Sequence, residues 1–347
     1  MTDQTDPAPD LAAAIKAIAR REALAPHALE AAIEELLTGA AAPEQVGAFL
    51  AGLAVRGETA ADLIAGARVL RRHARTLAVE GPLLDTCGTG GLAWKSLNTS
   101  TASAIVLAAC GVRVAKHGNR SVPPKTGSAD VLEALGVNLD MDEGRQTLCL
   151  DQAGVTFLYA RSHHSAMRHV APIRARLGIR TLFNLLGPLS NPAGASHQVL
   201  GVFDPHWIDP MAEALLALGI ERAWVVHGLD GIDEVSIAGA TQVAEVHNGE
   251  VRRFTVTPED AGLSRAPLSA LEGSGVDDNA GAIAMLLDGQ AGPFRDTVCL
   301  NAAAGLLILG AVPDLGTGAA RAAEVLDSGK ARATLTALVN ASHGRKD

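Results

Sequence analysis

The stretch Leu84-Asp85-Thr86-Cys87-Gly88-Thr89-Gly90-Gly91 carries the clearest structural signal in the chain. A short apolar run opens into glycines, and Asn98-Thr99-Ser100-Thr101 with a long Ala-rich stretch follows, which predicts a strand, a tight turn and a helix. Glycines let backbone N–H groups approach an anion, and a helix N-terminus adds a positive dipole end and hydroxyl donors. A phosphate-binding loop is therefore one interpretation. A turn capped by Asn98 or Ser100 is the other, and the residues favour neither.

C-terminal to this segment, short β-rich runs alternate with helical stretches. Such alternation predicts a largely parallel sheet with helices on both faces. The predicted strands are Val112–Ala115, Val155–Tyr159, Val199–Phe203 and Ala223–His227. Three later runs have no helices between them and predict antiparallel additions: Val235–Ile237, Gln242–Val246 and Val251–Val256.

N-terminal to the glycine-rich segment, the pattern is helical from Asp10 to about Ala74. Gly39 and Gly57 are placed to end two helices, Pro43 to begin one, and Thr59 to Asp62 resembles a capping box. We therefore expect an α/β protein with a small all-helical domain at residues 1–79. A large α/β domain with a mostly parallel sheet covered by helices would occupy residues 80–347.

The overall charge is acidic, with 29 Lys and Arg, 38 Asp and Glu, and a formal net charge of −9. This balance argues against a nucleic-acid or anionic-membrane partner but is compatible with a local basic pocket. We expect no secretory signal, and the longest apolar stretches fall short of the ~20 residues that span a bilayer. The cysteines lack Cys-x-x-Cys spacing, so we interpret them as small buried hydrophobes of a cytoplasmic protein: Cys87, Cys110, Cys149 and Cys299.

A second polar cluster, Lys116-His117-Gly118-Asn119-Arg120, comes directly after a predicted strand. Open α/β sheets present ligand groups at the carboxyl ends of their strands, so this turn of three potential cations and an amide favours anion binding over a solvated basic loop. Gly127-Ser128, before the helix-like Ala129 to Leu135, adds another potential N-terminal donor.

A third cluster, Asp233-Glu234, lies in a glycine-rich loop after an apolar strand. Adjacent carboxylates suit magnesium, which retains waters and bridges to substrate phosphates. Acidic loop pairs are usually only solvated, and this pair gains meaning because the other two clusters favour a polyphosphate.

The histidines His163, His164 and His169 have no Cys or carboxylate at zinc-site spacing, so capping, packing or substrate contact is the better interpretation. Arg174, Arg176 and Arg180 follow Pro172. One of these three could bind a planar carboxylate in bidentate fashion, and spacing does not say which.

Together these segments resemble the anthranilate phosphoribosyltransferase family. The similarity is colinear from about residue 85 to 240, and the C-terminal hundred residues add little. The matching motifs are GTGG at Gly88–Gly91, NTST at Asn98–Thr101, KHGNR at Lys116–Arg120, GSADVLEALG at Gly127–Gly136, HSAMRHVAPIR at His164–Arg174, LGIRTLFNLLGPLSNP at Leu177–Pro192 and GLDGIDE at Gly228–Glu234.

The resemblance implies the fold class that is shared with pyrimidine nucleoside phosphorylases, with helices from about 163–190 joining the helical domain. It implies a homodimer, substrates in a cleft between the domains, and transfer of the 5-phosphoribosyl group from phosphoribosyl diphosphate to anthranilate. Magnesium, with two ions, would be the cofactor. Orientation and charge stabilisation suffice for this reaction, so no catalytic acid or base is nominated.

The resemblance also assigns roles by motif position. Phosphoribosyl diphosphate would contact Gly88, Gly91, Ser96, Asn98, Thr99, Ser100, Thr101, Lys116, His117, Gly118, Asn119, Arg120 and Ser128. Anthranilate would face Gly88, Asn119 and Arg174, with Arg174 at its carboxylate. Magnesium would be held by Ser100 at one ion and by Asp233 and Glu234 at the other.

The chain departs from the family pattern near the same site. Leu92 replaces a common Asp, Pro123-Pro124 replaces a pair of serines, and Arg161 replaces a common proline. Lys95 and Lys125 are the nearest cations that could compensate, although solvation of both is equally compatible with the sequence. Two rivals are a nucleoside phosphorylase and a noncatalytic nucleic-acid-binding relative, and the acidic pair and the net charge respectively disfavour them.

Overall fold

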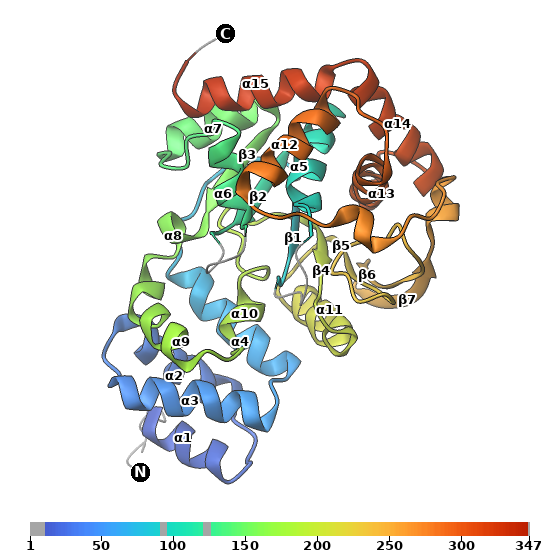
Figure 1. The fold of residues 1–347 in the computed structure, drawn as a ribbon. Helices are drawn as coiled ribbons and strands as arrows, with labels where there is room; N and C mark the ends of the chain where they lie inside the picture. The colour runs from blue at the N-terminus through green and yellow to red at the C-terminus, as the bar shows by residue number, and fades with distance from the viewer. Residues whose placement is uncertain (1–10, 91–95, 121–125, 346–347) are drawn as a thin grey trace. The chain divides into compact units, whose positions relative to one another are not determined.

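The computed structural model describes residues 11–90, 96–120 and 126–345. Contacts divide the chain into two compact units (Figure 1). The helical unit comprises the chain up to Arg75 together with His163–Ser190, and the sheet unit comprises Thr76–Ser162 and Asn191–Asp347.

The helical unit is built from amphipathic helices that begin and end where the sequence predicts. Thr59 and Asp62 form the expected capping box, and Gly39 ends its helix in the left-handed conformation, with φ 77°. Buried leucines, isoleucines and Phe49 form the interior of this unit. Its helices are α1 (Leu11–Ala19), α2 (Pro26–Thr38), α3 (Pro43–Arg56), α4 (Ala60–Arg72), the 3₁₀ turn η1 (Ser165–His169), α9 (Ala171–Leu177) and α10 (Phe183–Leu186), and α8 (Ala160–His163) lies at the boundary.

The sheet unit contains a seven-stranded sheet in the order β3-β2-β1-β4-β5-β6-β7. The first five strands in this order are parallel, and β6 and β7 are antiparallel additions, as the sequence predicts. The strands are β1 (Leu84–Gly88), β2 (Val114–Gly118), β3 (Val155–Tyr159), β4 (His197–Gly201), β5 (Arg222–Gly228), β6 (Thr241–His247) and β7 (Glu250–Val256).

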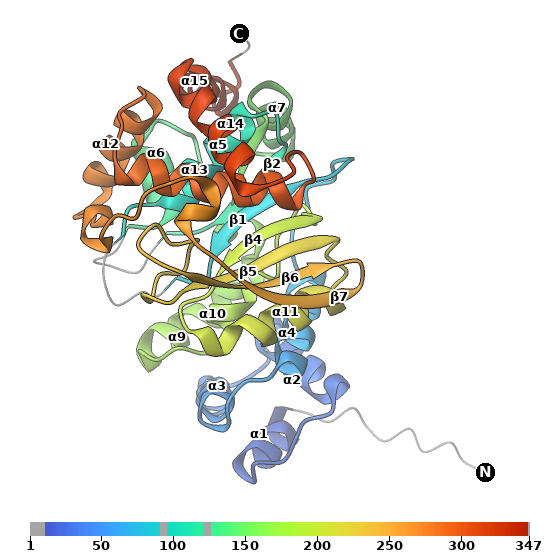
Figure 2. The ribbon, with the colours of Figure 1, turned by 90° about the vertical axis from the view of Figure 1, so that its right-hand side faces the viewer.

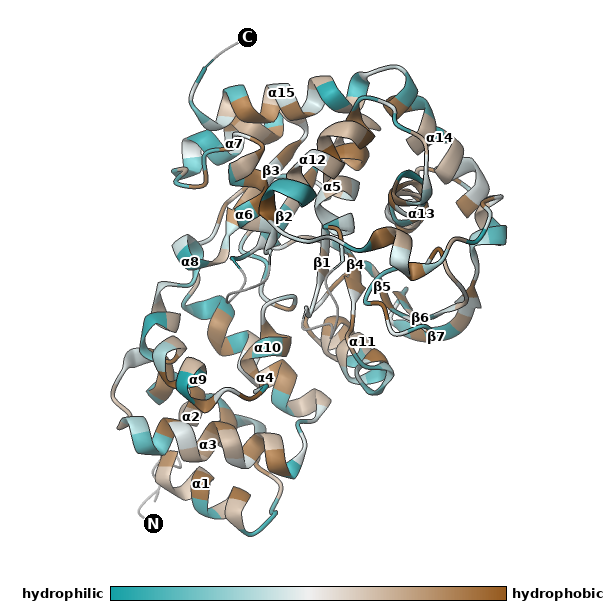
Figure 3. Ribbon diagram, viewed as in Figure 1, coloured by the Kyte–Doolittle hydropathy of each residue, from teal (hydrophilic) through white to brown (hydrophobic). Residues whose placement is uncertain are grey.

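Helices cover both faces of this sheet, with α5 and α13 on one face and α11 on the other (Figure 2). The surface helices α14 and α15 alternate between hydrophilic and hydrophobic residues along their length (Figure 3). The remaining helices are α5 (Thr99–Ala109), α6 (Ser128–Ala134), α7 (Glu143–Ala153), α11 (Ile208–Ala217), α12 (Val276–Leu287), α13 (Pro293–Ile308), α14 (Leu315–Asp327) and α15 (Lys330–Ser342), with 3₁₀ turns η2 (Pro205–Trp207), η3 (Pro258–Ala261) and η4 (Leu268–Leu271).

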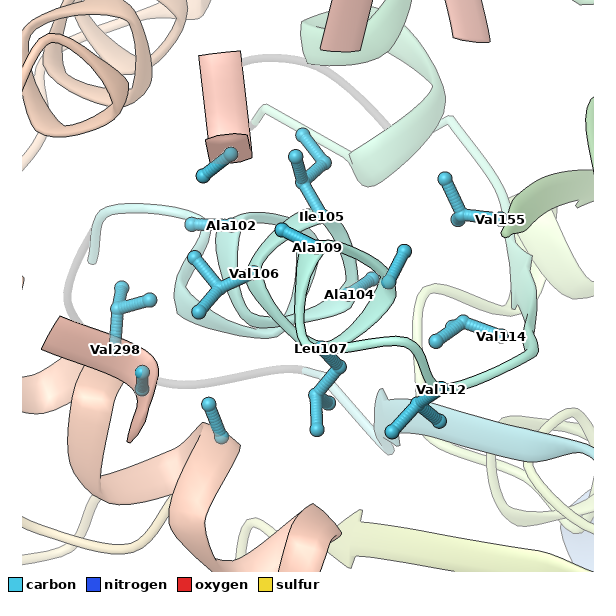
Figure 4. Packing of buried hydrophobic residues seen from close by; sticks show 14 of the residues in the cluster. Ala102, Ala104, Ile105, Val106, Leu107, Ala109, Val112, Val114, Val155 and Val298 are labelled. Atoms are coloured by element: carbon cyan, nitrogen blue, oxygen red, sulfur yellow. The ribbon is translucent and has the colours of Figure 1, made fainter. Parts of the chain in front are cut away.

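Helix α5 is buried on nearly all sides, which explains its Ala-rich sequence. Figure 4 shows its side chains packing between Val298 of α13 and the strand residues Val114 and Val155. Small side chains let the neighbouring backbones approach closely, and this close packing fixes the position of the N-terminus of α5 at the sheet edge.

One predicted strand is wrong. Val235–Ile237 forms no strand, because its polar backbone groups bond to side chains: Asn301 receives the N–H of Val235 at 3.0 Å and donates to its carbonyl at 2.9 Å. The side chains of Val235 and Ile237 are nevertheless fully buried. The apolar character that suggested a strand therefore belongs to a buried loop.

All four cysteines are free, and three are buried as expected, but Cys87 is partly exposed, which corrects its prediction. Within the part of the chain that the structure describes, no helix combines the length and apolar character needed to cross a bilayer.

Candidate functional site

The predicted ligand groups of the sheet unit lie where the strand order reverses. Strand β1 has β2 on one side and β4 on the other, and Gly88 is paired in register with Gly201 at their carboxyl ends. Open α/β sheets bind ligands at such a switch point. The connection after β1 leads to α5, the connection after β2 leads to α6, and the acidic pair follows β5.

Glycines let Asp233 pack against these strand ends. A Cβ atom on Gly88 would lie 2.7 Å from Oδ2 of Asp233, and one on Gly201 would lie 1.7 Å from the backbone oxygen of Asp233. Neither position can accept another residue without movement of the acidic loop. Gly118 has a similar relation to Ser128, whose Oγ would be 2.2 Å from an added Cβ atom.

A buried lysine connects the first two predicted clusters. The Nζ of Lys116, on β2, donates to the carbonyl of Thr86 on β1 and, at 3.2 Å, to Oγ of Ser100 on α5. Burial lowers the pKa of Lys116, while the charges of Asp85 and Glu234 raise it. Lys116 therefore lies beside both the start of α5 and the acidic pair.

The acidic pair is less exposed than acidic loop pairs usually are. Asp233 is only 8% exposed and Glu234 is partly buried. Burial, and then the neighbouring charge of Asp233, raises the pKa of Glu234 to about 8, and Lys116 and a backbone hydrogen bond from Ser100 oppose this. Two adjacent carboxyl groups beside one lysine offer several oxygen donors at one place. Such oxygen donors fit a hard divalent cation.

The N-terminus of α5 presents polar groups that no described residue satisfies. Oδ1 of Asn98 and Oγ1 of Thr101 are buried without a hydrogen-bond partner in the described part of the chain. Unsatisfied buried polar atoms are uncommon in native proteins and often mark a ligand site. Thr99 is buried beside them, with its hydroxyl near the carbonyl of Leu97 at 3.5 Å, and Ser96 forms a bridge with Glu272.

The KHGNR segment is arranged differently from its prediction. Lys116, His117 and Gly118 belong to β2, so they do not share one turn with the residues that follow. His117 is buried, and its N–H donates to Asp85 at 3.2 Å. The strand is longer than its apolar run because hydrogen bonding to β3 continues through Gly118.

Asn119 and Arg120 leave the strand and are exposed. Arg120 forms ion pairs with Asp130 and Glu133 of α6, each at 2.8 Å, and its guanidinium lies 5.9 Å from the ring centroid of Tyr159. These contacts tie the loop to α6, so Arg120 is already engaged by the protein. Oδ1 of Asn119 accepts a hydrogen bond from the N–H of Arg120 at 2.8 Å.

Arg174 lies on α9 in the helical unit, whereas the other predicted site residues belong to the sheet unit. It donates to Oδ1 of Asn184 at 3.3 Å and lies 5.6 Å from the ring centroid of Phe183. Burial lowers its pKa. Arg176 and Arg180 are exposed, so Arg174 is the most buried of the three arginines that the sequence left open.

The histidines of this region have packing roles. Nδ1 of His163 bonds to the carbonyl of Arg75 at 2.6 Å, and burial lowers the pKa of His164 to about 4. His169 packs against Gly39, where an added Cβ atom would lie 2.5 Å from its Nδ1. Among the described residues, no group of three or more His, Cys, Asp or Glu side chains is placed to hold a metal ion.

Three buried polar residues at the sheet edge escaped the sequence analysis. Asp85 is fully buried on β1 and accepts from Nδ2 of Asn191 at 2.8 Å, and burial raises its pKa. Asn279 on α12 accepts the N–H of Asn98 at 2.9 Å. Asp85 lies in the apolar run before the glycines and Asn191 lies in a matched motif, so a polar residue in a buried run was the available signal for both. No local motif marks Asn279.

Gly91, Leu92, Lys95, Pro123, Pro124 and Lys125 lie outside the described residues. Among the described residues, contacts connect five of the predicted site residues: Gly88, Ser100, Lys116, Asp233 and Glu234. Ser128 lies against Gly118.

Two family models match the chain. The helical bundle domain of a glycosyl transferase family matches residues 12–74, and the a/b domain of that family matches residues 80–332. An anthranilate phosphoribosyltransferase of Hyphomonas neptunium is 67% identical over 95% of this chain and 96% of its own length. The corresponding protein of Rhodospirillum rubrum is 50% identical, with 98% of each chain covered.

Solved structures give the same result. The anthranilate phosphoribosyltransferase of Thermus thermophilus superposes with a TM-score of 0.89 and 47% identity, covering 95% of this chain and 99% of its own. The Saccharomyces cerevisiae protein in complex with phosphoribosyl diphosphate and magnesium has a TM-score of 0.89, 26% identity and coverage of 96% and 98%. The same yeast protein with 4-fluoroanthranilate has a TM-score of 0.86, 26% identity and coverage of 96% and 99%.

Proposed function

Because the chain belongs to the anthranilate phosphoribosyltransferases, within a glycosyl transferase family, we propose that it transfers the 5-phosphoribosyl group from phosphoribosyl diphosphate to the amine of anthranilate. The products are N-(5-phosphoribosyl)anthranilate and diphosphate, as a step of L-tryptophan biosynthesis. The observation that carries this proposal is the convergence of a helix N-terminus, a buried lysine and a largely buried acidic pair at the carboxyl ends of the parallel strands.

The sheet-edge residues are proposed to bind phosphoribosyl diphosphate. The start of α5 offers backbone N–H groups, a positive dipole end and the hydroxyls of Ser100 and Thr101. Lys116 adds a positive charge beside Ser100, and Ser128 lies next to the end of β2. Because Arg120 is held by two carboxylates, we assign it the role of fixing the loop that carries Asn119.

Magnesium is the proposed cofactor. The oxygen donors of Asp233, Glu234 and Ser100 fit it, because carboxylate and hydroxyl oxygens are ligands that this hard cation prefers, and Lys116 lies beside both Ser100 and the acidic pair. We propose two ions, one held at Ser100 and one at the acidic pair. Bound magnesium would supply charge stabilisation for the departing diphosphate.

The remaining roles need orientation more than proton transfer. The anthranilate amine is neutral at pH 7, so the barrier lies in expelling diphosphate from C1 of the ribose. Lys116 and the N–H groups at the start of α5 would stabilise the departing charge. Arg174 would hold the aromatic carboxylate and thereby orient the amine. No residue is assigned as a general base.

We also propose the domain boundaries 1–79 and 80–347, with the helices of about 163–190 joining the helical domain, and a homodimer in the cytoplasm. Light scattering after size-exclusion chromatography measures the oligomeric state, and a mass of one chain would contradict the homodimer.

Anthranilate fluorescence tests the reaction directly. The protein is incubated with anthranilate, phosphoribosyl diphosphate and magnesium, and each component is omitted in turn. We expect the fluorescence to fall only when all components are present. Unchanged fluorescence in the complete mixture would contradict the proposed function.

Replacing Arg174 by Ala tests the assignment of the anthranilate carboxylate. Loss of a charged hydrogen-bonding partner costs ~1.5–3 kcal/mol, so we expect the anthranilate KM to rise roughly ten- to hundredfold. The KM of phosphoribosyl diphosphate should change much less. Arg176→Ala on the same helix is the matched control, because Arg176 is exposed. Equal increases for both substrates would count against this placement.

A further inference from the structure

Asn279, on α12, is hydrogen-bonded to the residue that directly precedes α5. Its side chain is 1% exposed. Its Oδ1 accepts the N–H of Asn98 at 2.9 Å, and its Nδ2 donates to the carbonyl of Gly275 at 2.8 Å and lies 3.5 Å from Oγ1 of Thr126. Asn98 directly precedes α5, and Thr126 lies two residues before α6. One amide therefore contacts the starts of both helices.

The chain before Asn279 strengthens this connection. The N–H of Leu97 donates to the carbonyl of Leu271 at 2.8 Å, and Ser96 forms a bridge with Glu272. Gly273 lies so close to the amide that a Cβ atom there would be 2.7 Å from Nδ2 of Asn279. Residues 271–279 thus lie alongside residues 96–98, and this arrangement places the side-chain amide of Asn279 next to Asn98.

The bond to Asn279 fixes a residue that no regular element fixes. Asn98 has φ −76° and ψ 69°, which is neither helical nor extended, and its side chain makes no capping bond to α5. Its Oδ1 and the nearby Oγ1 of Thr101 have no partner in the described part of the chain. By accepting the N–H of Asn98, Asn279 fixes the backbone of the residue that carries the first of these two polar atoms.

We propose that Asn279 is a positioning residue for phosphoribosyl diphosphate, setting the geometry of the α5 and α6 entrances without contacting the substrate. This inference rests on the proposed function. A preorganised site avoids the cost of ordering its donors during binding, so loss of Asn279 should weaken affinity for this substrate specifically.

The variants are Asn279→Ser and Asn279→Ala, with Asn138→Ala as the matched control. A serine hydroxyl on a helix can bond the carbonyl four residues earlier, which is Gly275, so Asn279→Ser preserves that bond while losing reach to Asn98 and Thr126. Asn138 is half-buried, and its Nδ2 donates to the carbonyl of Ser342 at 3.2 Å. Its truncation also removes an amide bond between distant segments, but at α15.

The measurements are the Kd of phosphoribosyl diphosphate by calorimetry at fixed magnesium, the KM of both substrates and the melting temperature. We expect Asn279→Ser and Asn279→Ala to raise the Kd and KM of phosphoribosyl diphosphate about tenfold, as the loss of a buried hydrogen bond implies, while the anthranilate KM stays within about twofold. Asn138→Ala should lower the melting temperature and leave this Kd unchanged.

Wild-type affinity in Asn279→Ser overturns the inference, and this variant decides the question if Asn279→Ala fails to fold. An equal loss of affinity in Asn138→Ala also overturns it, because the effect would then follow general stability. Failure of the proposed function has a different signature, because the wild-type protein would then consume no anthranilate.

Discussion

Two groups of charged side chains on the same sheet balance their charges differently. At the carboxyl end of the parallel strands, Asp233 and Glu234 lie side by side with Lys116 near, and the pKa of Glu234 is raised to about 8, by burial first and then by the charge of Asp233. On the antiparallel hairpin, Glu245 of β6 accepts from Arg222 and Trp224 of β5 and from Arg252 of β7. Burial alone would raise the pKa of Glu245, but the bonds from Arg222 and Trp224 outweigh it and lower the pKa.

The difference separates a structural carboxylate from a pair of carboxylates that we propose to bind a cation. The charge and lone pairs of Glu245 are satisfied by side chains of the neighbouring strands, so this carboxylate has no need of a bound cation. In the acidic pair, burial and the charge of Asp233 disfavour the ionised form of Glu234, and a bound cation would favour it. Burial is common to both groups, and the identity of the partners distinguishes them.

The largest expected effect comes from removing the charge of the acidic pair. We expect Asp233→Asn combined with Glu234→Gln to lower magnesium-dependent turnover about hundredfold or more, because a metal ion contributes several kcal/mol of charge stabilisation. The melting temperature near pH 7 should fall little, since the Glu234 carboxyl, with a pKa raised to about 8, is largely protonated there and glutamine resembles its neutral form. Steady-state kinetics and thermal unfolding measure the two quantities. Wild-type turnover at saturating magnesium would eliminate the pair from the mechanism.

The next effect is a dependence of stability on pH. Glu234 binds its proton more tightly folded than unfolded, so the stability of the metal-free protein should fall as pH rises from about 5 and level off above about 8. Between pH 6 and pH 8 we expect a loss of at most ~2 kcal/mol. Thermal unfolding in chelator across this range measures it. Magnesium and Glu234→Gln should each flatten the curve, and equal slopes in all three samples would contradict the assignment.

The smallest expected effect concerns the hairpin. Glu245→Gln retains the shape but loses charge-assisted bonds from Arg222 and Arg252, so the free energy of unfolding should fall by about 1 kcal/mol. Both KM values and kcat should match the wild type. Urea unfolding and steady-state kinetics test this, and a loss of activity greater than about twofold would remove the contrast between the two groups.

The sequence predicts the elements better than the contacts between them. Capping by Thr59 and Asp62 and the strand Val155–Tyr159 appear at their predicted bounds, because local hydrogen bonds and apolar runs specify them. The polar end of β2, including Lys116, was assigned to a turn because its strand character depends on pairing with β3. Likewise, Val235–Ile237 looks like a strand until Asn301, which is distant in sequence, takes its backbone bonds.

The sequence predicts which residues belong to the candidate site, but it does not predict how they are arranged in space. The motifs indicate Lys116, Ser100 and the acidic pair, yet burial of Asp233 follows from close approach to Gly88 and Gly201, which belong to different strands. Asn279 has no local signal because its partners, Asn98 and Thr126, precede it by many residues.

The strand order has a consequence for the protein during its synthesis. Strand β1 emerges early but pairs with β4 on one side, and the acidic loop that packs on both strands is pinned by Asn301 of α13. A nascent chain that ends before Asn301 has Gly88 and Lys116. It lacks the side chain that bonds the backbone of Val235, directly after the acidic pair. Parallel pairing of distant segments is intrinsically slow. Until β4 has left the ribosome, the backbone N–H and C=O groups on one side of β1 lack their native strand and can bond to other strands. The site is thus among the last parts of the molecule to form, although its first residues are made early.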